Sequence, residues 1–378
     1  MKNAIRTVPQ FTSLEGFLNA SLRRFMLTAG LGALVAAWAV PAVAQNPATP
    51  APSPITVGGV VYAQYAYQMT ALQGATDTFH TNAFDVTRAY LNVIGRFSGG
   101  IMTRVTADIA HVTNGQQTYR LKYAYAGYNP EGSALTYKLG LMQTPYLDWE
   151  EALWDYRMQG QVVLDGPYLS SSNFGADVDG NINKEQVDFQ AGIFDNGSYS
   201  AGVGDERKDF QARVSVRAMD TDDPSRVGGL RVTGFAQIGK PPLGGTRSRF
   251  VGVVSYKSKM LTLAGMFTMA TDSITGATAE TKGQVLSAFG VYHLSGTPVA
   301  VIARFDHIKP NKDAPSTTVG FTANHIVLGA SYQLSPNVRL LLDANLLSEA
   351  NENTLTAAQQ NAFDATKSNL MFQTQFTF

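Results

Sequence analysis

The chain contains no cysteine, and this absence excludes several kinds of site. Without cysteine there can be no disulfide framework, no thiolate metal site and no cysteine nucleophile. Charged residues are also scarce, at 15% of the chain, and the 29 lysines and arginines are matched by 29 aspartates and glutamates. A chain without a basic excess gives no indication of nucleic-acid binding.

A long apolar run occurs near the start of the chain and is missing from the rest of it. Residues 25–44 are almost wholly apolar or small, follow Arg23 and Arg24, and end in Ala42-Val43-Ala44. This arrangement is typical of a secretory signal peptide with a small-residue cleavage site, so residues 1–44 are predicted to be a signal peptide. The alternative is an uncleaved membrane anchor, because the run is long enough to span a bilayer.

Residues 45–54 carry prolines at positions 47, 50, 52 and 54. Proline removes backbone donors and stiffens the chain, so this segment is predicted to be a linker that precedes the folded part, residues 55–378. No stretch of that folded part is apolar enough for a membrane helix. A membrane-embedded form of it would therefore have to be a closed β-barrel, since only helices and barrels satisfy their backbone groups in lipid.

The folded part alternates apolar with polar side chains over about sixteen short segments. A period of two residues is typical of strands. Turn signals such as Ser98-Gly99-Gly100 and Ser335-Pro336-Asn337 separate the segments, and the connections alternate between short and long along the chain. The sequence therefore predicts an all-β fold, an antiparallel transmembrane barrel of about sixteen strands with short periplasmic turns and long external loops. A soluble secreted β-protein is the alternative.

The segment 368–378 shows the alternation with aromatic residues on one side. Leu370, Phe372, Phe376 and Phe378 share the apolar side, and an interfacial aromatic residue is typical of a strand in a barrel wall. The pattern resembles the assembly signal of bacterial outer-membrane barrels, which implies recognition by the barrel assembly machinery. A sheet edge that happens to contain phenylalanine is the alternative.

Several strands carry basic residues on their polar side. Because a charge turned toward lipid costs a few kcal/mol, these residues are predicted to line the lumen. They are Arg88, Arg96, Arg104, Arg120, Lys122 and Lys138. Strict alternation in the segment Tyr119–Tyr128 places Tyr123 and Tyr125 with Leu121 on the lipid side.

The connection 144–172 is the longest one in the barrel and contains two of the three tryptophans. It is predicted to form a short helix over Asp148–Met158 and to fold into the pore as a constriction, because exposed tryptophans would be unusual. Opposed acidic and basic groups would then produce a field across the pore. An ordinary external loop is the alternative. The predicted constriction residues are Asp148, Trp149, Glu150, Glu151 and Asp155.

Two stretches carry a family resemblance. The segments Asp85-Val86-Thr87-Arg88-Ala89-Tyr90-Leu91 and Leu121-Lys122-Tyr123-Ala124-Tyr125-Ala126-Gly127-Tyr128, the latter followed by Tyr137 to Pro145, resemble the phosphate-selective porin O and P family. The resemblance implies a sixteen-stranded trimeric barrel with its third loop folded inward and with phosphate-selective arginines. This chain departs from that pattern in its acidic third loop, so a general or weakly selective channel is expected.

The predicted function is passive diffusion of small hydrophilic solutes or ions, including anions such as phosphate, through a porin in the outer membrane of a Gram-negative bacterium. The expected partners are outer-membrane lipids and two further copies of the chain in a homotrimer. No enzyme activity, cofactor or metal site is predicted, because the five histidines show no metal spacing and no triad stands near them. A plugged, structural or adhesin-type barrel without a conducting pore is the alternative.

Overall fold

The structure is a computed structural model that describes residues 55–73, 78–111, 116–197, 199, 206–241, 244–274, 279–364 and 367–378. The predicted signal peptide and the proline-rich linker lie outside the described residues.

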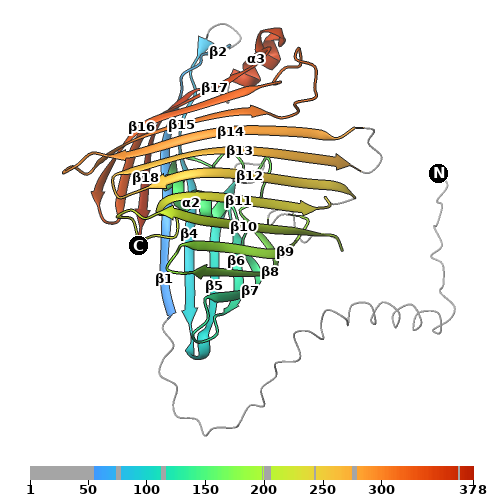
Figure 1. Cartoon of the computed structure of the whole chain (residues 1–378). Helices are drawn as coiled ribbons and strands as arrows, with labels where there is room; N and C mark the ends of the chain where they lie inside the picture. Colours follow the sequence, from blue (N-terminus) through green and yellow to red (C-terminus); the bar gives the residue numbers. More distant parts are fainter. Residues whose placement is uncertain are drawn as a thin grey trace, which may run out of the picture. The chain divides into compact units, whose positions relative to one another are not determined.

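Sixteen strands within the described residues form one closed antiparallel barrel in which strands next to each other in sequence are neighbours (Figure 1). This confirms the predicted fold. The strands are β1 (Ile55–Gln68), β4 (Asn82–Arg96), β5 (Ile101–His111), β6 (Gln117–Tyr128), β7 (Leu135–Gln143), β8 (Ser172–Ile182), β9 (Val187–Asp195), β10 (Lys208–Met219), β11 (Gly229–Gly239), β12 (Gly245–Lys257), β13 (Leu261–Ile274), β14 (Thr281–His293), β15 (Val299–Lys309), β16 (Ala323–Ser335), β17 (Val338–Glu349) and β18 (Asn369–Thr377).

The barrel closes where β18 pairs with β1. Their register places Phe376 opposite Val61 and Leu370 opposite Tyr67. Beyond this ladder the main chains of Gly59 and Phe378 exchange two hydrogen bonds, at 2.9 and 3.0 Å. A closed ladder leaves no strand edge with unpaired backbone groups, which is the condition for a sheet in lipid.

The connections alternate between the two ends of the barrel because successive strands are antiparallel neighbours. One end, called the turn end here, carries the connections 97–100, 129–134, 183–186, 220–228, 258–260, 294–298 and 336–337. The other, the loop end, carries the connections 69–81, 112–116, 144–171, 196–207, 240–244, 275–280, 310–322 and 350–368. The turn at Ser98-Gly99-Gly100 has φ of 74° at Gly99 and 77° at Gly100, a region that glycine adopts readily.

Some strands extend further toward the loop end than the alternation predicted. The apolar alternation in the sequence predicts strands over Arg249–Tyr256 and Leu261–Ala270, whereas β12 begins at Gly245 and β13 ends at Ile274. Thr246 and Ser273 face each other there, with their hydroxyl oxygens 2.8 Å apart. The backbone ladder continues past the apolar part of each strand, so the connection 240–244 is shorter than expected.

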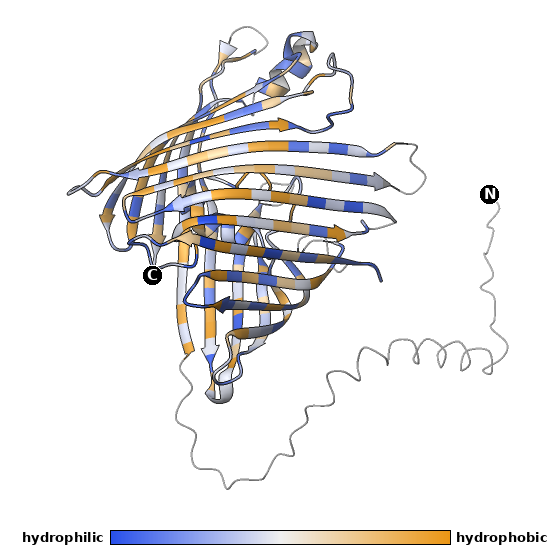
Figure 2. Ribbon diagram, viewed as in Figure 1, coloured by the Kyte–Doolittle hydropathy of each residue, from blue (hydrophilic) through white to orange (hydrophobic). Residues whose placement is uncertain are grey.

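Hydrophobic and hydrophilic residues alternate along the strands (Figure 2), and large apolar side chains are exposed on the outside while the inside holds both apolar and polar ones. On the outside, Val254, Leu263 and Leu328 are each about half exposed, whereas their neighbours Val253 and Val327 face inward and are buried. This alternation follows from the pleat of a strand. The exposed apolar belt matches the requirement of a barrel that is surrounded by lipid.

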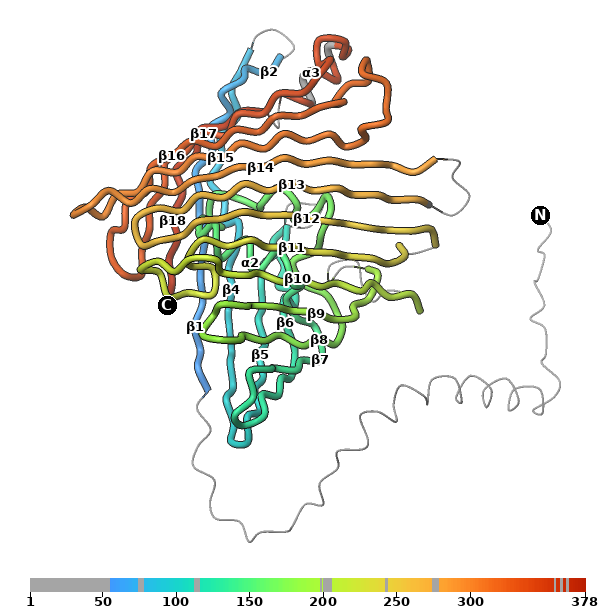
Figure 3. Tube along the Cα trace, in the orientation of Figure 1, coloured from blue at the N-terminus to red at the C-terminus, as the bar shows by residue number. Residues whose placement is uncertain are grey.

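At the loop end the first and last connections meet. Strands β2 (Leu72–Gln73) and β3 (Thr78–Phe79) form a small two-stranded sheet, and β2 contacts helix α3 (Ala357–Asp364) (Figure 3). The described helices are all too short or too polar to cross a membrane.

Candidate functional site

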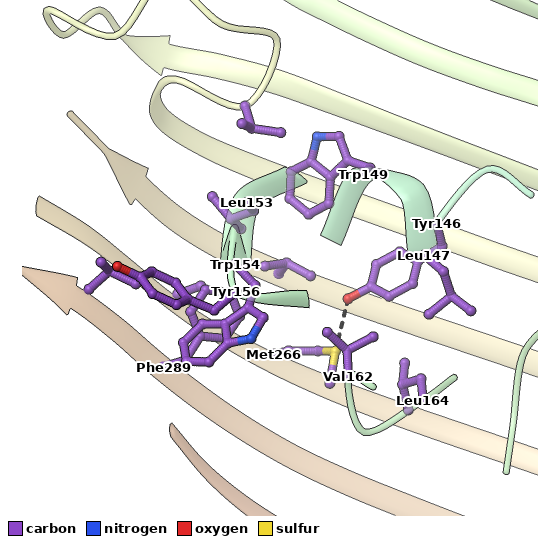
Figure 4. Close-up of a cluster of buried hydrophobic side chains, with 14 of the residues drawn as sticks. Tyr146, Leu147, Trp149, Leu153, Trp154, Tyr156, Val162, Leu164, Met266 and Phe289 are labelled. Atoms are coloured by element: carbon purple, nitrogen blue, oxygen red, sulfur yellow. Dashed lines mark hydrogen bonds between the residues drawn. The ribbon is translucent and has the colours of Figure 1, made fainter. Parts of the chain in front are cut away.

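The connection 144–171 folds into the barrel and is called the inner segment here. It contains helix α2 (Leu147–Trp154) and the 3-10 helix η3 (Arg157–Gln159). Both tryptophans of α2 are fully buried (Figure 4). The centre of the Trp154 ring lies 5.0 Å from the centre of the Phe289 ring, which projects from β14. The Tyr146 hydroxyl donates a hydrogen bond to the sulfur of Met266 on β13.

The inner segment spans the barrel from the loop end to the turn end. Near the loop end the Arg249 guanidinium donates to the main-chain oxygen of Tyr168 at 3.1 Å. Near the turn end the Lys257 ammonium donates to the main-chain oxygen of Ala152 at 2.9 Å. Contacts at both ends fix the position of the segment along the barrel axis.

The wall that receives α2 carries a group of apolar side chains on its inner face, beside buried polar ones such as Arg304 and Asp306. Inward side chains from β11 to β17 form one cluster with the apolar side of the inner segment; on the wall these are Phe235, Val251, Val253, Met266, Val285, Phe289, Val291, Ile302, Val327 and Leu341. The sequence prediction expected a polar lumen and missed this wall. The signal is present in Val251 to Val254, where both faces of a strand are apolar.

Each predicted acidic constriction residue has a defined place. Asp148 forms an ion pair with Arg226 from the turn 220–228. The Glu151 carboxylate lies 2.7 Å from the Arg157 guanidinium, and the Asp155 carboxylate lies 3.2 Å from that of Arg339 on β17. Arg226 and Arg339 were absent from the predicted site, because pairing between distant segments leaves no pattern in a single sequence.

Glu150 differs from the other acids of α2 because it is buried and one of its carboxylate oxygens has no hydrogen-bond partner among the described residues. Burial raises the pKa of Glu150 to about 8, although Arg304 opposes this shift. Burial would also raise the pKa of Asp148, but Arg226 holds that pKa below its usual value. Two carboxyls on one helix therefore carry different charges near neutral pH.

The predicted basic residues lie on the wall opposite the apolar one. Arg88 and Arg120 share Asp108, at 2.9 and 3.5 Å, so these two charges are partly balanced within the wall itself. Lys138 forms an ion pair with Asp179. Arg96 lies next to the turn 97–100 and is exposed.

Arg104 and Lys122 have no carboxylate partner among the described residues. Arg104 donates to the Asn92 side-chain oxygen at 2.9 Å and lies 4.5 Å from the ring centre of Tyr123. Lys122 donates to the Ser171 hydroxyl at 2.5 Å and lies 4.2 Å from the ring centre of Tyr199. Both side chains are held at close range by neutral groups, and Lys122 is buried.

A β-bulge in β6 corrects one part of the sequence prediction. Thr106 pairs with Tyr123 and Ala107 with Leu121, so Lys122 is the extra residue of the bulge. Residues after a bulge change face, and Tyr125 is accordingly buried in the interior. The prediction that placed Tyr123 and Tyr125 on the lipid side is wrong, because strict alternation does not anticipate an inserted residue.

The three phenylalanines of the predicted assembly signal face outward, two on β18 and one, Phe378, directly after it. Phe372, Phe376 and Phe378 are each about half exposed. The rings of Phe376 and Phe378 stack with their centres 6.0 Å apart. A Cβ atom added to Gly59 would lie 2.5 Å from the Phe378 ring, so the absence of a side chain at Gly59 makes room for that ring.

No cluster of three or more histidine, aspartate or glutamate side chains in the described part of the chain could hold a metal ion.

No family model matches the chain, and no curated protein matches it. Solved structures of similar fold are outer-membrane proteins. The outer-membrane protein OmpT of Vibrio cholerae has a TM-score of 0.60 and 11% identity over 86% of this chain and 98% of its own. OmpF of Salmonella typhi, in complex with daunomycin, has a TM-score of 0.58 and 14% identity, and the match covers 86% of this chain and 98% of OmpF. The outer membrane channel DcaP of Acinetobacter baumannii has a TM-score of 0.57 and 8% identity, and the match covers 86% of this chain and 97% of DcaP. At these identities the likeness establishes the fold alone.

Proposed function

We propose that the protein is an outer-membrane porin that lets small hydrophilic solutes or ions diffuse through its barrel. The observation that carries this proposal is the closed sixteen-stranded barrel with charged side chains on its inner wall. A barrel of this size leaves an aqueous channel, whereas eight strands would be filled by side chains. The fold is shared with known outer-membrane proteins, one of which is described as a channel.

The cellular context belongs to the same proposal. The apolar outer belt suits the outer membrane of a Gram-negative bacterium, with the turn end in the periplasm, as in other barrels with longer external loops. A homotrimer is the proposed assembly, and a trimeric form is known for OmpT of Vibrio cholerae. The phenylalanines of β18 would be read by the barrel assembly machinery.

The inner segment is the proposed constriction. Its apolar side covers the wall from β11 to β17, so solutes would pass between its polar side and the wall from β4 to β7. Asp148, Glu151 and Asp155 are each paired with an arginine, and Glu150 is buried. The segment therefore presents less unpaired negative charge to the lumen than its composition suggests. A transverse electric field across the pore stays a prediction.

A weak preference for anions is part of the proposal and is assigned to Arg104 and Lys122, two wall residues without a carboxylate partner among the described residues. Replacing both, as Arg104→Gln with Lys122→Gln, should shift the reversal potential in a salt gradient toward cations. Arg88→Gln is the matched control, because Arg88 already shares a carboxylate. An unchanged reversal potential in the double variant would contradict the assignment of selectivity to these two residues.

The resemblance to phosphate-selective porins adds phosphate as one anion to be compared with chloride. We propose no phosphate specificity, because the inner segment carries acidic residues where that family would favour basic ones. The proposal is for a passive channel and includes no catalytic reaction.

The direct test is conductance in planar bilayers. Purified and folded protein, identified by heat-modifiable migration in detergent gels, should produce stepwise increases in current. A folded barrel that gives no steps would instead support a plugged or structural barrel.

A further inference from the structure

The turn 220–228 is longer than the other turns at its end of the barrel, and its shape is fixed by its own hydrogen bonds. The Thr221 hydroxyl accepts the N–H of Gly229 at 3.1 Å and donates to the main-chain oxygen of Lys257 at 2.6 Å. The Asp223 carboxylate accepts the N–H of Ser225 at 2.8 Å. These bonds give the turn one conformation and attach it to the end of β12.

This turn contacts α2 through two consecutive residues. The Arg226 guanidinium pairs with the Asp148 carboxylate and donates to the main-chain oxygen of Asp148 at 3.1 Å. Val227 is only 2% exposed and belongs to the same apolar cluster as Trp149 and Trp154. The turn therefore holds the first turn of α2 by an ion pair and by apolar packing.

The other end of α2 is held from the adjacent strand end. Lys257, the last residue of β12, donates to the main-chain oxygen of Ala152 at 2.9 Å. A cation is favourable at the carbonyl end of a helix, and an acid such as Asp148 is favourable at its start. Both ends of α2 are thus held by residues from the turn end, although the inner segment enters from the loop end.

The space between α2 and these turns is not filled. A cavity of about 470 Å³ is lined by Trp154, Asp223, Arg226, Lys257 and His293, among others. The turn and α2 therefore meet at a few points around a hollow instead of through continuous packing. Because these contacts are few, each one has a large share in fixing how the turn and α2 lie relative to each other.

We propose that the turn 220–228 positions the constriction, with Arg226 and Val227 as positioning residues that hold α2 against the apolar wall. The cross-section of the pore is then set from the turn end by this contact. The inference rests on the proposed channel function, because it assigns a role in conduction to a contact between two segments.

The first test compares single-channel conductance of the wild type with that of Arg226→Ala. Loss of this partly exposed ion pair should increase the fraction of time spent in a higher-conductance, undocked level up to about fivefold. Lys259→Ala is the matched control, because it removes a positive charge from the neighbouring turn at an exposed side chain. Arg226→Lys should retain most of the wild-type behaviour, and the charge exchange Arg226→Asp with Asp148→Arg should restore part of it.

A second measurement does not depend on conduction. Two of the three tryptophans of the chain lie in α2, and the third, Trp38, lies in the predicted signal peptide. Acrylamide quenching of tryptophan fluorescence in the folded mature protein therefore reports on α2 directly. Quenching should increase in Arg226→Ala and in Val227→Ser, and it should stay at the wild-type level in Lys259→Ala.

The outcomes separate the two proposals. If the folded wild type does not conduct but quenching rises in the Arg226 and Val227 variants, the channel function fails and the docking contact stands. If the wild type conducts and these folded variants match it in both conductance and quenching, the positioning role is wrong.

Discussion

At the scale of single residues, Glu150 occupies the least polar position of the acids on α2. It is 3% exposed, and it faces Arg304 and Asp306 from β15 without a complete set of hydrogen bonds. Its pKa of about 8 means that the neutral form is the one suited to the docked helix. Ionisation would place a buried charge close to the Asp306 carboxylate and without a complete set of hydrogen bonds among the described residues, at a cost to docking.

The pH dependence of docking follows from this raised pKa. A carboxyl with a pKa of 4.5 when exposed and about 8 when docked favours docking fully below about pH 4.5 and progressively less up to about pH 8. Acrylamide quenching of the α2 tryptophans should therefore increase between pH 5 and pH 8 in the wild type. The Glu150→Gln variant should show a much flatter profile over this range.

The control for this titration is Asp220→Asn, which changes a carboxylate that is exposed in the turn 220–228. Its quenching profile should follow that of the wild type. An equally steep profile in Glu150→Gln would assign the titration to another group.

At the scale of elements, α2 depends on apolar packing for its place in the barrel. Trp154→Ala removes the ring that packs against Phe289 and should weaken docking by about 3–5 kcal/mol, the usual cost of a large-to-small change in a core. Quenching of the remaining Trp149 should rise and conductance should increase. Trp154→Phe preserves an aromatic ring and should lie close to the wild type; equal quenching in all three proteins would contradict this account.

Strand β18 closes the barrel through its backbone and through aromatic packing on its outer face. Phe378→Ala keeps the hydrogen bonds with Gly59 but removes the ring that covers it. We expect less folded protein in the outer membrane and an unchanged conductance for the barrels that do insert. Immunoblots of membrane fractions check this, with Leu370→Ala as a control on the same face; normal levels of the Phe378 variant would contradict it.

The elements differ in how far the sequence predicts them. The strands were predictable because each one has an apolar outer face, and this alternation survives in a single sequence. The polar ends of β12 and β13 were not predictable from the sequence, because the backbone pairing continues there beyond the residues with an apolar outer face. The bulge at Lys122 and the partners Arg226 and Arg339 were also missed, since inserted residues and contacts between distant segments follow no local period.

At the scale of the whole molecule, the barrel has two inner walls of different character. The wall from β11 to β17 contributes most of the apolar side chains that receive α2, among buried polar ones, whereas the wall from β4 to β7 carries all six predicted basic residues. The inner segment divides the lumen between these walls, because it is bonded to residues at both ends of the barrel. The inner segment therefore occupies part of the space that a barrel of sixteen strands would otherwise leave open.

The measurement that tests the central claim most directly is single-channel conductance of the wild type beside a variant in which residues 147–169 are replaced by a short glycine-serine linker. The account predicts discrete conductance steps for the wild type and clearly larger steps for the variant, because the constriction has been removed. Absence of steps in both folded proteins, or equal steps in the two, would contradict it.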